Sequence, residues 1–598
     1  MSLGRAFGAG LGARLLALAA SLSLVAGCAT HGPPDVPAAD NAPVRLRVIA
    51  FNDFHGHLEP GTLSLNLADP AAPTQPLRVA VGGAPALAGL VDALRASAPH
   101  SVLVSSGDMV GAAPLVSALF RHESTIDVMN QIGVDVAAPG NHEFDAGVTE
   151  LQRLLRGGCG VDAADAAMQS CARQVHTGAH FPVVAANIED AAGQTLFAPF
   201  WVQRYGTVRV GFIGAVTRST PFIVVPSGVA GLRFTDEAAA INRSAAQLKA
   251  QGVNAMVVTM HEGGETGSAG QPADWNDPNC PQARGPGFEI ARRLSPDIDL
   301  ILTAHTHQGY NCLIGGRPVM QAVSFGRGVS VADLLIDPFS GRVVREQTVS
   351  RNLPVFNDRS DATQRAAIAA AQPEPYAAAL RDSRSRPAIT QAVAAYAAAA
   401  APRSQRVVGR IAGDFDRRGR ADSAAGRLVA DAQWAATRAP DRGGAQLALM
   451  NPGGIRSDLA CSAGPPCSVT YGDAFTMQPF GNNLVVMSLS GAELKALLEG
   501  QTAAGPLLSP SAGLSYRWLA RAAPGQRVQE LRLNGESVRP ELDYRVTVNN
   551  FMADGGDGLS VLRQGRQRLG GPQDLDALLE LLQTSPAPTS APRIEWVD

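Results

Sequence analysis

The sequence predicts an α/β protein with two α/β domains joined by a helical segment. Three observations lead to this prediction. Short apolar runs in the first half end at metal-binding residue types, helical patterns separate these runs, and a second strand–helix pattern follows an Ala-rich stretch. Alternation of strands and helices is typical of α/β folds. The chain has 598 residues, too many for one hydrophobic core, so several domains are expected.

The composition is that of an ordinary globular protein. Hydrophobic residues make up 45% and charged residues 17%, which argues against disorder. The formal net charge is −3, so the sequence carries no basic field that would attract a nucleic-acid polymer. We therefore expect no nucleic-acid polymer as a partner, and the sequence leaves the oligomeric state open.

Residues 1–28 predict a lipoprotein signal peptide. Arg5 and Arg14 flank the start of an apolar stretch over residues 15–25, which is too short for a permanent membrane span. The ending Leu24-Val25-Ala26-Gly27-Cys28 resembles a bacterial lipobox. This resemblance implies cleavage before Cys28 and a lipid on its thiol. The alternative is an ordinary signal peptide with an incidental cysteine.

The residues after Cys28 predict the location of the protein. Ala29 follows the cysteine, and this residue type would send a lipoprotein to the outer membrane. Residues 29–43 contain four prolines and predict a flexible tether. We therefore expect a cell-envelope protein that contacts the membrane through its lipid alone and faces either the periplasm or the exterior.

The remaining cysteines predict disulfides. Seven cysteines less Cys28 leave six, an even number in an oxidising compartment, although six cysteines allow 15 connectivities. A structural zinc site, the rival interpretation, would need paired short spacings that are absent from the sequence. Close spacing, with elimination for the last pair, favours Cys159–Cys171, Cys461–Cys467 and Cys280–Cys312.

Five apolar runs in the first half read as buried strands that end at metal-binding residues. In an open sheet, functional residues gather at the carboxyl ends of the strands, so these five ends predict a metal cluster. An isolated Asp or His in a loop is usually only solvated, but the joint pattern makes that interpretation poor. The runs are residues 48–51, 102–104, 134–137, 256–259 and 298–302, and the motifs after them are Asn52-Asp53-Phe54-His55, Gly107-Asp108, Gly140-Asn141-His142-Glu143-Phe144-Asp145, His261-Glu262-Gly263-Gly264 and His305-Thr306-His307.

Helical patterns complete the predicted organisation. Residues 44–354 form the predicted first domain, residues 355–404 a helical connector, and residues 405–598 the second domain. Predicted helices of the first domain are residues 87–96, 115–132 and 238–251; the second domain has predicted helices at 426–437 and 491–500 and predicted strands at 446–450 and 544–549.

The metal-binding motifs occur in the order D-x-H, G-D, G-N-H-E and H-x-H, which resembles the calcineurin-like metallophosphoesterases. The resemblance implies a four-layer αββα domain and two divalent ions that grip a transferring phosphoryl group. Oxygen and imidazole donors suit Zn²⁺ or Mn²⁺, with Mg²⁺, Co²⁺ and Ca²⁺ as further options. The resemblance implies that Asp108 bridges the two ions. The first ion would also be held by Asp53, His55 and His307, and the second by Asn141, His261 and His305.

A longer match identifies the chain as similar to the 5′-nucleotidase family. N-D-x-H, G-N-H-E-F-D and H-x-G-G, followed by a second domain, cover most of residues 45–565. The resemblance implies that His142 stabilises the phosphate in the transition state, that Asp145 orients its ring, and that a metal-activated water attacks phosphorus. His307 departs from several relatives, which carry Gln or Asn there, so the metal preference is open to change. Glu143 and Glu262 are expected to form hydrogen bonds rather than to contact metal.

The second domain carries three motifs that resemble the substrate-binding part of this family. The resemblance implies that Phe480 and Phe551 sandwich a nucleobase, that Asp557 holds the ribose hydroxyls, and that Arg456 pairs with phosphate. Core packing is the alternative fate of each phenylalanine. The motifs are Asn451-Pro452-Gly453-Gly454-Ile455-Arg456, Phe480-Gly481-Asn482 and Phe551-Met552-Ala553-Asp554-Gly555-Gly556-Asp557-Gly558.

Further substrate contacts follow from the same resemblance. Asn451, Asn482 and Gly513 are expected neighbours of the nucleotide. The family also supplies arginine from the loop before the first helix of the second domain. Arg418 is the expected residue, although Arg417 and Arg420 compete and spacing does not decide among them. The histidines without a supporting pattern are expected to be structural or exposed: His57, as a bystander near the first metal loop, and His100, His122, His176 and His180.

Together these features predict a lipid-anchored two-metal phosphohydrolase whose substrate is a nucleotide. The resemblance implies activity on nucleoside 5′-monophosphates, with UDP-sugars and 2′,3′-cyclic nucleotides as further substrates. One alternative is the thiosulfohydrolase of sulfur oxidation, which shares the two-domain architecture. Another is a surface binding lipoprotein without catalysis, which the complete set of metal-ligand motifs argues against.

Overall fold

The computed structural model describes residues 42–160, 169–267, 274–462, 464–502, 505–584, 586–587 and 591–598. Residues 42–598 belong to one compact unit. The signal peptide, Cys28 and the tether up to residue 41 lie outside the described residues, so those predictions stay predictions. Within the described ranges, no helix has the length and apolar character needed to cross a membrane.

Two β-sheets form the centre of the first half of the chain. The first has the order β15 (Val349–Pro354), β14 (Gly328–Ile336), β1 (Val44–Phe51), β4 (His100–Ser105) and β5 (Val136–Ala137). The second has the order β12 (Gly309–Ile314), β13 (Arg317–Ala322), β11 (Leu300–Leu302), β10 (Ala255–His261), β8 (Val208–Val216) and β7 (Phe200–Tyr205).

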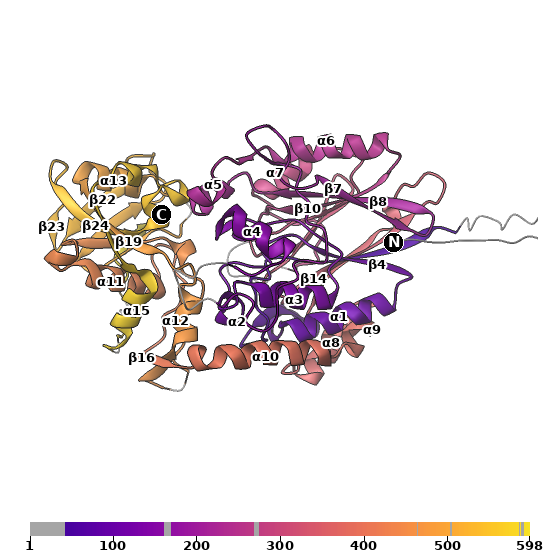
Figure 1. The fold of residues 1–598 in the computed structure, drawn as a ribbon, viewed down its shortest axis with the longest axis horizontal. Coiled ribbons are helices and arrows are strands. Elements are labelled where there is room, and N and C mark those ends of the chain that lie inside the picture. The colour runs from indigo at the N-terminus through magenta and orange to yellow at the C-terminus, as the bar shows by residue number, and fades with distance from the viewer. Residues whose placement is uncertain are drawn as a thin grey trace, which may run out of the picture. The chain divides into compact units, whose positions relative to one another are not determined.

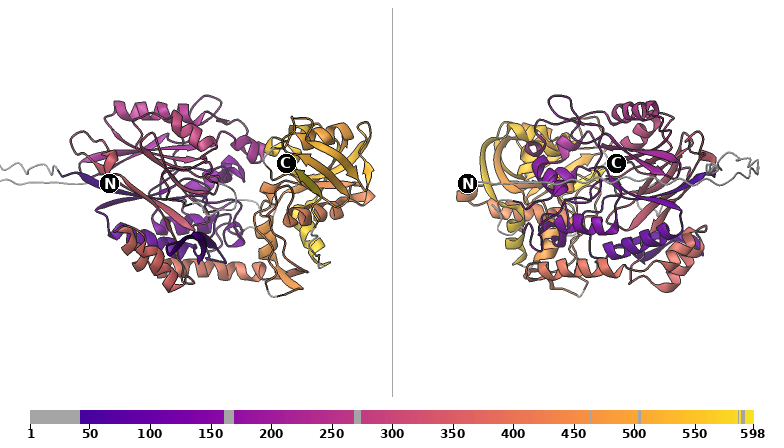
Figure 2. Two further views of the ribbon diagram at one scale, coloured as in Figure 1. Left: turned by 180° about the vertical axis from the view of Figure 1, so that it is seen from behind. Right: turned by 45° about the vertical axis from the view of Figure 1, so that its right-hand side comes forward.

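Helices cover the outer face of each sheet. Figure 1 shows α6 (Glu237–Ala250) and α7 (Pro286–Arg293) on the second sheet, and α1 (Ala84–Ala96) and α3 (Glu123–Ile132) on the opposite side. The view from behind in Figure 2 has the same order of layers. A cluster of buried side chains from both sheets, including Val102 and Phe212, fills the space between them. The four-layer αββα prediction is therefore confirmed.

The strand order brings the predicted metal motifs together. β1 pairs in parallel with β4, and β4 with β5, while β10 pairs in parallel with β8 and β11. The carboxyl ends of parallel strands meet at one edge of a sheet. The loops after these strands carry the metal motifs, as the sequence predicts.

The structure divides one predicted helix into two. The sequence predicts a single helix over residues 115–132, but the structure has α2 (Leu115–Ala118), a break, and then α3 from Glu123. The break occurs because Arg121, with φ 50°, and His122, with φ 64°, both lie in the left-handed region directly before the first residue of α3. A left-handed residue cannot continue a right-handed helix, and no periodicity in the sequence reveals it.

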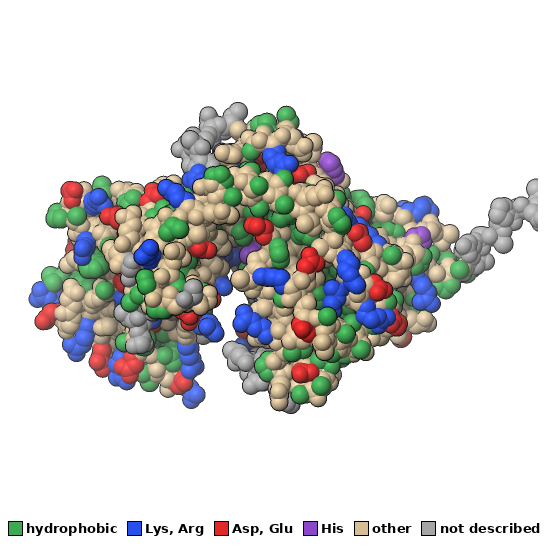
Figure 3. Space-filling model, turned by 90° about the horizontal axis from the view of Figure 1, so that it is seen from below, with side chains coloured by type: hydrophobic (Ala, Val, Ile, Leu, Met, Phe, Trp, Pro, Cys, Tyr) green, Lys and Arg blue, Asp and Glu red, His purple; other side chains and the backbone are tan. Residues whose placement is uncertain are grey.

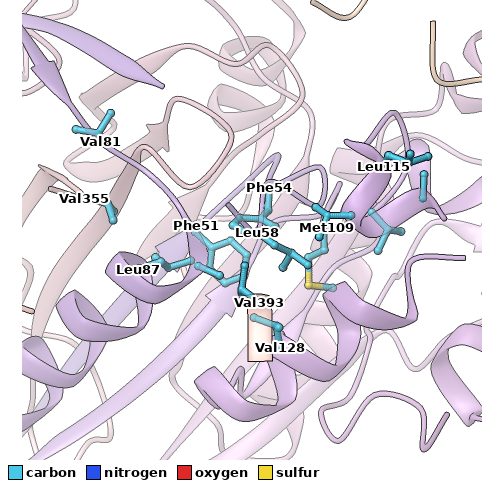
Figure 4. Packing of buried hydrophobic residues seen from close by; sticks show 14 of the residues in the cluster. Phe51, Phe54, Leu58, Val81, Leu87, Met109, Leu115, Val128, Val355 and Val393 are labelled. Carbon is cyan, nitrogen blue, oxygen red and sulfur yellow. The ribbon is translucent and has the colours of Figure 1, made fainter. Parts of the chain in front are cut away.

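The Ala-rich segment forms three helices: α8 (Ala362–Ala370), α9 (Tyr376–Asp382) and α10 (Pro387–Ser404). The α10 helix contacts α1 and α3 and also α12 (Tyr471–Met477) of the second half. Figure 4 shows Val393 of α10 beside Val128 and Phe51 in one buried cluster. The connector is thus packed as part of the core, and the predicted boundaries at residues 354 and 404 remain predictions.

The second half has its own sheets and helices. Its main sheet has the order β20 (Ser509–Pro510), β17 (Leu447–Met450), β24 (Asp543–Asn549), β19 (Asn483–Ser490) and β25 (Arg566–Gln573). A smaller sheet has the order β23 (Glu536–Ser537), β22 (Val528–Leu533), β21 (Leu514–Leu519) and β26 (Ile594–Val597). The helices include α11 (Ala424–Thr437), α13 (Gly491–Glu499), α14 (Asn550–Ala553) and α15 (Asp574–Leu582).

Three disulfides join the six remaining cysteines. Cys159 pairs with Cys171, Cys280 with Cys312, and Cys461 with Cys467. The pairing that close spacing favours is thus confirmed. Acidic and basic side chains are interspersed over the face seen in Figure 3, in keeping with a net charge of only −3.

Candidate active site

The predicted metal ligands converge on one point. Three groups of side chains bring their ligand atoms within 4.8 Å of one another, and Asp108 belongs to two of them. This shared position suits a bridging carboxylate, because one anion can screen two cations. The groups are Asp53, His55 and His307; His55, Asp108 and His142; and Asp108, His261 and His305.

The backbone of these loops is held in an uncommon conformation. Five of the seven predicted ligands have positive φ: Asp53 at 50°, His55 at 47°, Asp108 at 52°, His305 at 71° and His307 at 55°. Non-glycine residues rarely adopt this region, and such strain persists mainly at functional sites where the surrounding structure enforces it. The clustering is therefore an argument for a built site that does not depend on motif matching.

The imidazole rings are oriented as metal ligands. His55 Nδ1 lies 2.9 Å from the Gly111 carbonyl oxygen, and His261 Nδ1 lies 2.9 Å from that of Ser106. A carbonyl accepts only a proton donor, so Nδ1 carries the proton and each Nε2 presents a lone pair to the centre. His55 Nε2 then faces His307 Nε2 at 3.3 Å. Nitrogen and carboxylate donors converging in this way fit divalent cations.

Core packing fixes the loops behind the ligands. Phe54, between two predicted ligands, and Met109, directly after Asp108, are both buried. Figure 4 shows them with Leu58 in the apolar cluster beneath the metal loops. Because neighbouring side chains are locked in a close-packed core, the ligands between them have little freedom to move.

Glu143 ties two metal loops together. Its carboxylate accepts hydrogen bonds from the backbone N–H groups of Asp108 at 2.9 Å, Met109 at 2.8 Å, Val110 at 3.4 Å and Gly140 at 2.5 Å. Burial, with the charge of Asp108 added, raises the pKa of Glu143 to about 7. The expected hydrogen-bonding role of Glu143 thus has a clear geometry.

His142 and Asp145 form the dyad that the resemblance implies. His142 Nδ1 lies 2.8 Å from Asp145 Oδ2. Burial alone would lower the pKa of His142, but Asp145 and Asp108 outweigh it and raise that pKa above its ordinary value. The ring is therefore biased toward the cation, which can offset charge on phosphate oxygens.

A cavity of about 400 Å³ joins the metal centre to the second half of the chain. Asn141, His142 and His305 from the first half line it together with Phe480 and Phe551 from the second half. This volume lies within the range of small-molecule sites. The sequence-predicted phosphate and base residues therefore share one cavity.

Arg456 brings positive charge from the second half to the metal centre. Its half-buried side chain interacts electrostatically with Asp108 and Asp145. Burial lowers the pKa of His55, and the charge of Arg456 adds to that effect. Burial lowers the pKa of Arg456 itself, and the two aspartates oppose that effect. Arg456 also stands over the ring of Phe480, 6.0 Å from its centroid.

Asp557 is oriented by two asparagines. Asn451 Nδ2 donates to Asp557 Oδ2 at 2.7 Å, and Asn549 Nδ2 donates to Asn451 Oδ1 at 3.0 Å. All three residues line the cavity. Burial raises the pKa of Asp557, while the Asn451 hydrogen bond opposes the shift. Asn451 thus orients the carboxylate of Asp557. Asn549 is a cavity residue that the motifs did not reveal.

Asn482 is held by a buried carboxyl. Its Nδ2 donates to Asp574 Oδ2 at 3.2 Å, and the Asp574 backbone N–H donates to its carbonyl at 2.8 Å. Asn482 lines the cavity, as expected, whereas Gly513 is not among the lining residues. Burial raises the pKa of Asp574 to about 7.

The structure places the three competing arginines in different surroundings. Burial, with the charge of Arg417 added, lowers the pKa of both Arg456 and Arg327. The guanidinium of Arg417 pairs with Asp458 at 3.3 Å and does not line the cavity. Arg418, the predicted residue, has an 88% exposed side chain 3.7 Å from Asp416 and does not line the cavity. Arg420 pairs with Asp598 at 2.6 Å. None of the three arginines lines the cavity, so the predicted contact of Arg418 with the substrate stays a prediction.

The cavity also contains residues for which the sequence offered no motif. His122 lines it, although the sequence analysis expected this histidine to be structural or exposed. Ile223, Val224 and Val225 line it as well, at the end of α5 (Thr220–Ile223). These residues reach the cavity through tertiary folding, and no local spacing pattern marks them.

Comparison with known proteins agrees with this architecture. Residues 46–309 match the model of the calcineurin-like phosphoesterase family, and residues 407–564 match that of the 5′-nucleotidase C-terminal domain. Endonuclease YhcR of Bacillus subtilis is 30% identical over 553 residues, 91% of this chain and 40% of the relative. A cell wall protein of Listeria monocytogenes is 29% identical over 549 residues, 88% of this chain and 65% of that protein.

The chain therefore spans less than two thirds of the length of these two relatives. A probable 5′-nucleotidase of Treponema pallidum is 28% identical over 589 residues, 86% of this chain and 87% of the relative. Among solved structures, a 5′-nucleotidase precursor from Thermus thermophilus has a TM-score of 0.71 and 26% identity, covering 93% of this chain and 99% of that chain.

The sulfate thiohydrolase SoxB of Thermus thermophilus shares the fold, with a TM-score of 0.66 and 18% identity over 92% of this chain and 96% of that chain. The two family models match the two halves of the chain that line the cavity. The first half carries the metal motifs, and the second half carries the motifs of Phe480 and Phe551. The chain belongs to the 5′-nucleotidase family, with a calcineurin-like phosphoesterase domain followed by a 5′-nucleotidase C-terminal domain.

Proposed function

We propose that this protein hydrolyses nucleoside 5′-monophosphates to nucleoside and phosphate, in a reaction that needs two divalent ions. One observation carries the proposal: Asn141, His142 and His305 of the first half and Phe480, Phe551 and Asp557 of the second half line a single cavity. A phosphate at the metal centre and a base between the two phenyl rings would both lie in this cavity. UDP-sugars and 2′,3′-cyclic nucleotides are further candidate substrates.

The metal ligands are proposed as two sets that share Asp108. Asp53, His55 and His307 would complete one set, and Asn141, His261 and His305 the other. The donors are oxygen and imidazole nitrogen, which favours Zn²⁺ or Mn²⁺. Bound there, the ions would neutralise phosphate charge and activate water for attack on phosphorus.

The side chains of the protein contribute charge and orientation. Arg456 lies near Asp108 and can pair with phosphate oxygens as a bidentate donor. His142 is held by Asp145, and its raised pKa favours the protonated ring beside the phosphate. Both groups would stabilise the transition state, in which negative charge on the equatorial oxygens must be offset.

The C-terminal domain would recognise the nucleoside. Phe480 and Phe551 offer flat apolar faces, and stacking tolerates several bases. Asp557, oriented by Asn451, can accept hydrogen bonds from both ribose hydroxyls. The affinity of the enzyme for a nucleotide should therefore exceed its affinity for a phosphate ester that lacks a base.

The enzyme is further proposed to be anchored in the outer membrane by lipid on Cys28. The support is the apolar stretch and the lipobox-like sequence that ends at this residue. Replacement Cys28→Ser should release the protein from the membrane fraction, and mass spectrometry should find a lipid-modified N-terminal cysteine in the wild type. An unmodified N-terminus after cleavage would refute the anchor without touching the enzymatic proposal.

The test is hydrolysis of AMP, UDP-glucose and 2′,3′-cyclic AMP by the full chain after chelation and re-addition of Mn²⁺ or Zn²⁺. Phosphate release is followed for AMP, and the organic product for the other two. Metal-restored hydrolysis supports the proposal and ranks the substrates. If the protein binds two metal ions but hydrolyses none of the three substrates, the proposed function is refuted and the thiosulfohydrolase alternative is favoured.

A further inference from the structure

The wall of the cavity that belongs to the N-terminal domain is almost entirely apolar beyond the metal centre. Ala112, Ala113 and Ala118 form part of it, and Ile223 and Val225 form another part. Apart from the metal centre and the His142–Asp145 dyad, one residue that lines this wall has a side chain able to form a hydrogen bond. This residue is His122. A lone polar group on an apolar wall is the usual device by which a pocket orients its ligand.

The backbone at His122 is in a conformation that does not follow from helix formation. The residue has φ 64° and ψ 3° and immediately precedes α3, where its side chain forms no cap hydrogen bond. Helix N-caps normally have extended backbone and a Ser, Thr, Asp or Asn side chain that bonds the first turn. In the turn between α2 and α3, the His122 N–H donates to the Ser117 carbonyl at 3.0 Å and its carbonyl accepts from the Thr125 N–H at 3.0 Å. The backbone of His122 is thus held in place, while its side chain caps no helix and lines the cavity.

The ring of His122 is held from behind by a buried hydroxyl. Ser117 Oγ lies 2.9 Å from His122 Nδ1 and 2.7 Å from Thr125 Oγ1. Ser117 is itself fully buried, and a Cβ on Gly56 would come within 2.5 Å of it. The glycine between His55 and His57 of the first metal loop thus makes room for the serine that positions His122.

This arrangement leaves one ring nitrogen for a ligand. Nδ1 is engaged by Ser117, and none of the hydrogen bonds between described residues engages Nε2. Burial lowers the pKa of His122 to about 4, so the imidazole is neutral near pH 7. A neutral Nε2 forms one hydrogen bond and adds no charge next to the phosphate site.

We propose that His122 is a substrate-binding residue of the N-terminal domain, with its Nε2 hydrogen-bonded to the nucleoside part of the substrate. The inference rests on the proposed nucleotide substrate and deepens it. The nucleoside would then be held from both sides, by stacking on Phe480 and Phe551 and by this imidazole from the opposite wall. Recognition from both domains would favour the nucleotide over smaller phosphate esters.

The test compares His122→Ala and His122→Gly with the wild type on AMP and on 4-nitrophenyl phosphate. Loss of one hydrogen bond should raise the Michaelis constant for AMP about threefold to tenfold in both variants. The Michaelis constant for the aryl phosphate and the metal content should stay unchanged. His122→Gly should also melt at a higher temperature than His122→Ala, because glycine relieves the left-handed strain.

Glu530→Gly is the matched control. Glu530 has φ 49°, like His122, but lies on β22 and does not line the cavity. This variant should leave the Michaelis constant for AMP as in the wild type. Equal effects of the His122 variants on both substrates, or an effect in only one of the two variants, would overturn the assignment.

Calorimetric titration of AMP separates this inference from the proposed function. If the wild type hydrolyses neither ester with metals restored, the proposed function fails, and AMP binding alone then decides the role of His122. Weaker AMP binding by His122→Ala than by the wild type supports the assignment. Equal binding, or no binding by the wild type, overturns it.

Discussion

The phenyl ring of Phe480 lies nearly parallel to the imidazole of His142, with 5.8 Å between the ring centroids and 21° between the planes. The two residues come from opposite halves of the chain. Phe480 also has the Arg456 guanidinium 6.0 Å from its centroid. One phenyl ring therefore contacts both groups that are proposed to stabilise the phosphate, while it also borders the proposed base site.

This double contact predicts different effects for the two phenylalanines. Phe480→Leu should raise the Michaelis constant for AMP about tenfold, because base stacking is lost. It should also lower kcat severalfold for AMP and for 4-nitrophenyl phosphate, because His142 loses the ring packed against it. Steady-state kinetics on both substrates measures the two effects.

Phe551→Leu is the control for that experiment. The Phe551 ring lies against Gly556, where a Cβ would come within 2.4 Å of it. Its replacement should raise the Michaelis constant for AMP alone and leave kcat for the aryl phosphate unchanged. Equal effects of the variant on both substrates would remove the stacking assignment.

His142→Ala should lower kcat about 10²- to 10³-fold, because a preorganised donor to the phosphate is lost. Metal content, measured by plasma mass spectrometry, should remain near normal, since the proposed metal ligands stay in place. Asp145→Asn should lower kcat less, because the ring remains but its orientation and charge are less well supported. Loss of metal from His142→Ala would contradict the role given to this residue.

Glu143→Gln should weaken metal binding about 10- to 100-fold although Glu143 is not a predicted ligand. The amide nitrogen of glutamine cannot accept the backbone N–H groups of Asp108 and Gly140, so the two metal loops lose their common anchor. Titration of the chelated protein with Mn²⁺ measures the change. Unchanged affinity with full activity would show that the loops keep their geometry without this carboxylate.

Asp574 should make the stability of the protein depend on pH. Burial raises its pKa from 3.8 to about 7. Because the folded state then binds the proton more tightly, its stabilising contribution is full below about pH 4, falls as pH rises toward 7, and is flat above. Asp574→Asn removes this dependence, so the stability of the variant relative to that of the wild type should rise by a few kcal/mol as the pH increases from 4 to 8.

Melting temperatures of both proteins at pH 5 and pH 8 measure this effect. The difference between Asp574→Asn and the wild type should be larger at pH 8. Asp576→Asn, at an exposed position of the same helix α15, is the matched control. A difference that does not grow with pH would mean that the Asp574 carboxyl ionises in the folded protein at its ordinary pKa.

Much of the fold could be predicted from the sequence because its signals are local. A buried strand is a short apolar run, and its end is marked by the next polar residues, so the loops with Asp53, Asp108 and His261 could be located without coordinates, and the family resemblance then named these residues as candidate ligands. The same holds for Phe551, whose neighbours are glycines and an aspartate. The parallel pairing of β1 with β4 and of β10 with β11 then brings such ends together, as the strand-end rule predicts.

Other features depend on contacts between segments far apart in the chain. The sequence could not choose among Arg417, Arg418 and Arg420, because the direction of each side chain is set by how its loop packs. Periodicity predicted one helix through His122, since two left-handed residues, Arg121 and His122, leave no trace in an apolar pattern. The sequence by itself determined the domain types, the disulfide-forming cysteines and the ligand-bearing loops. Only the tertiary structure decided which side chains of the two halves, Phe480 and His142 among them, meet across one cavity, because such contacts arise from packing rather than from local sequence.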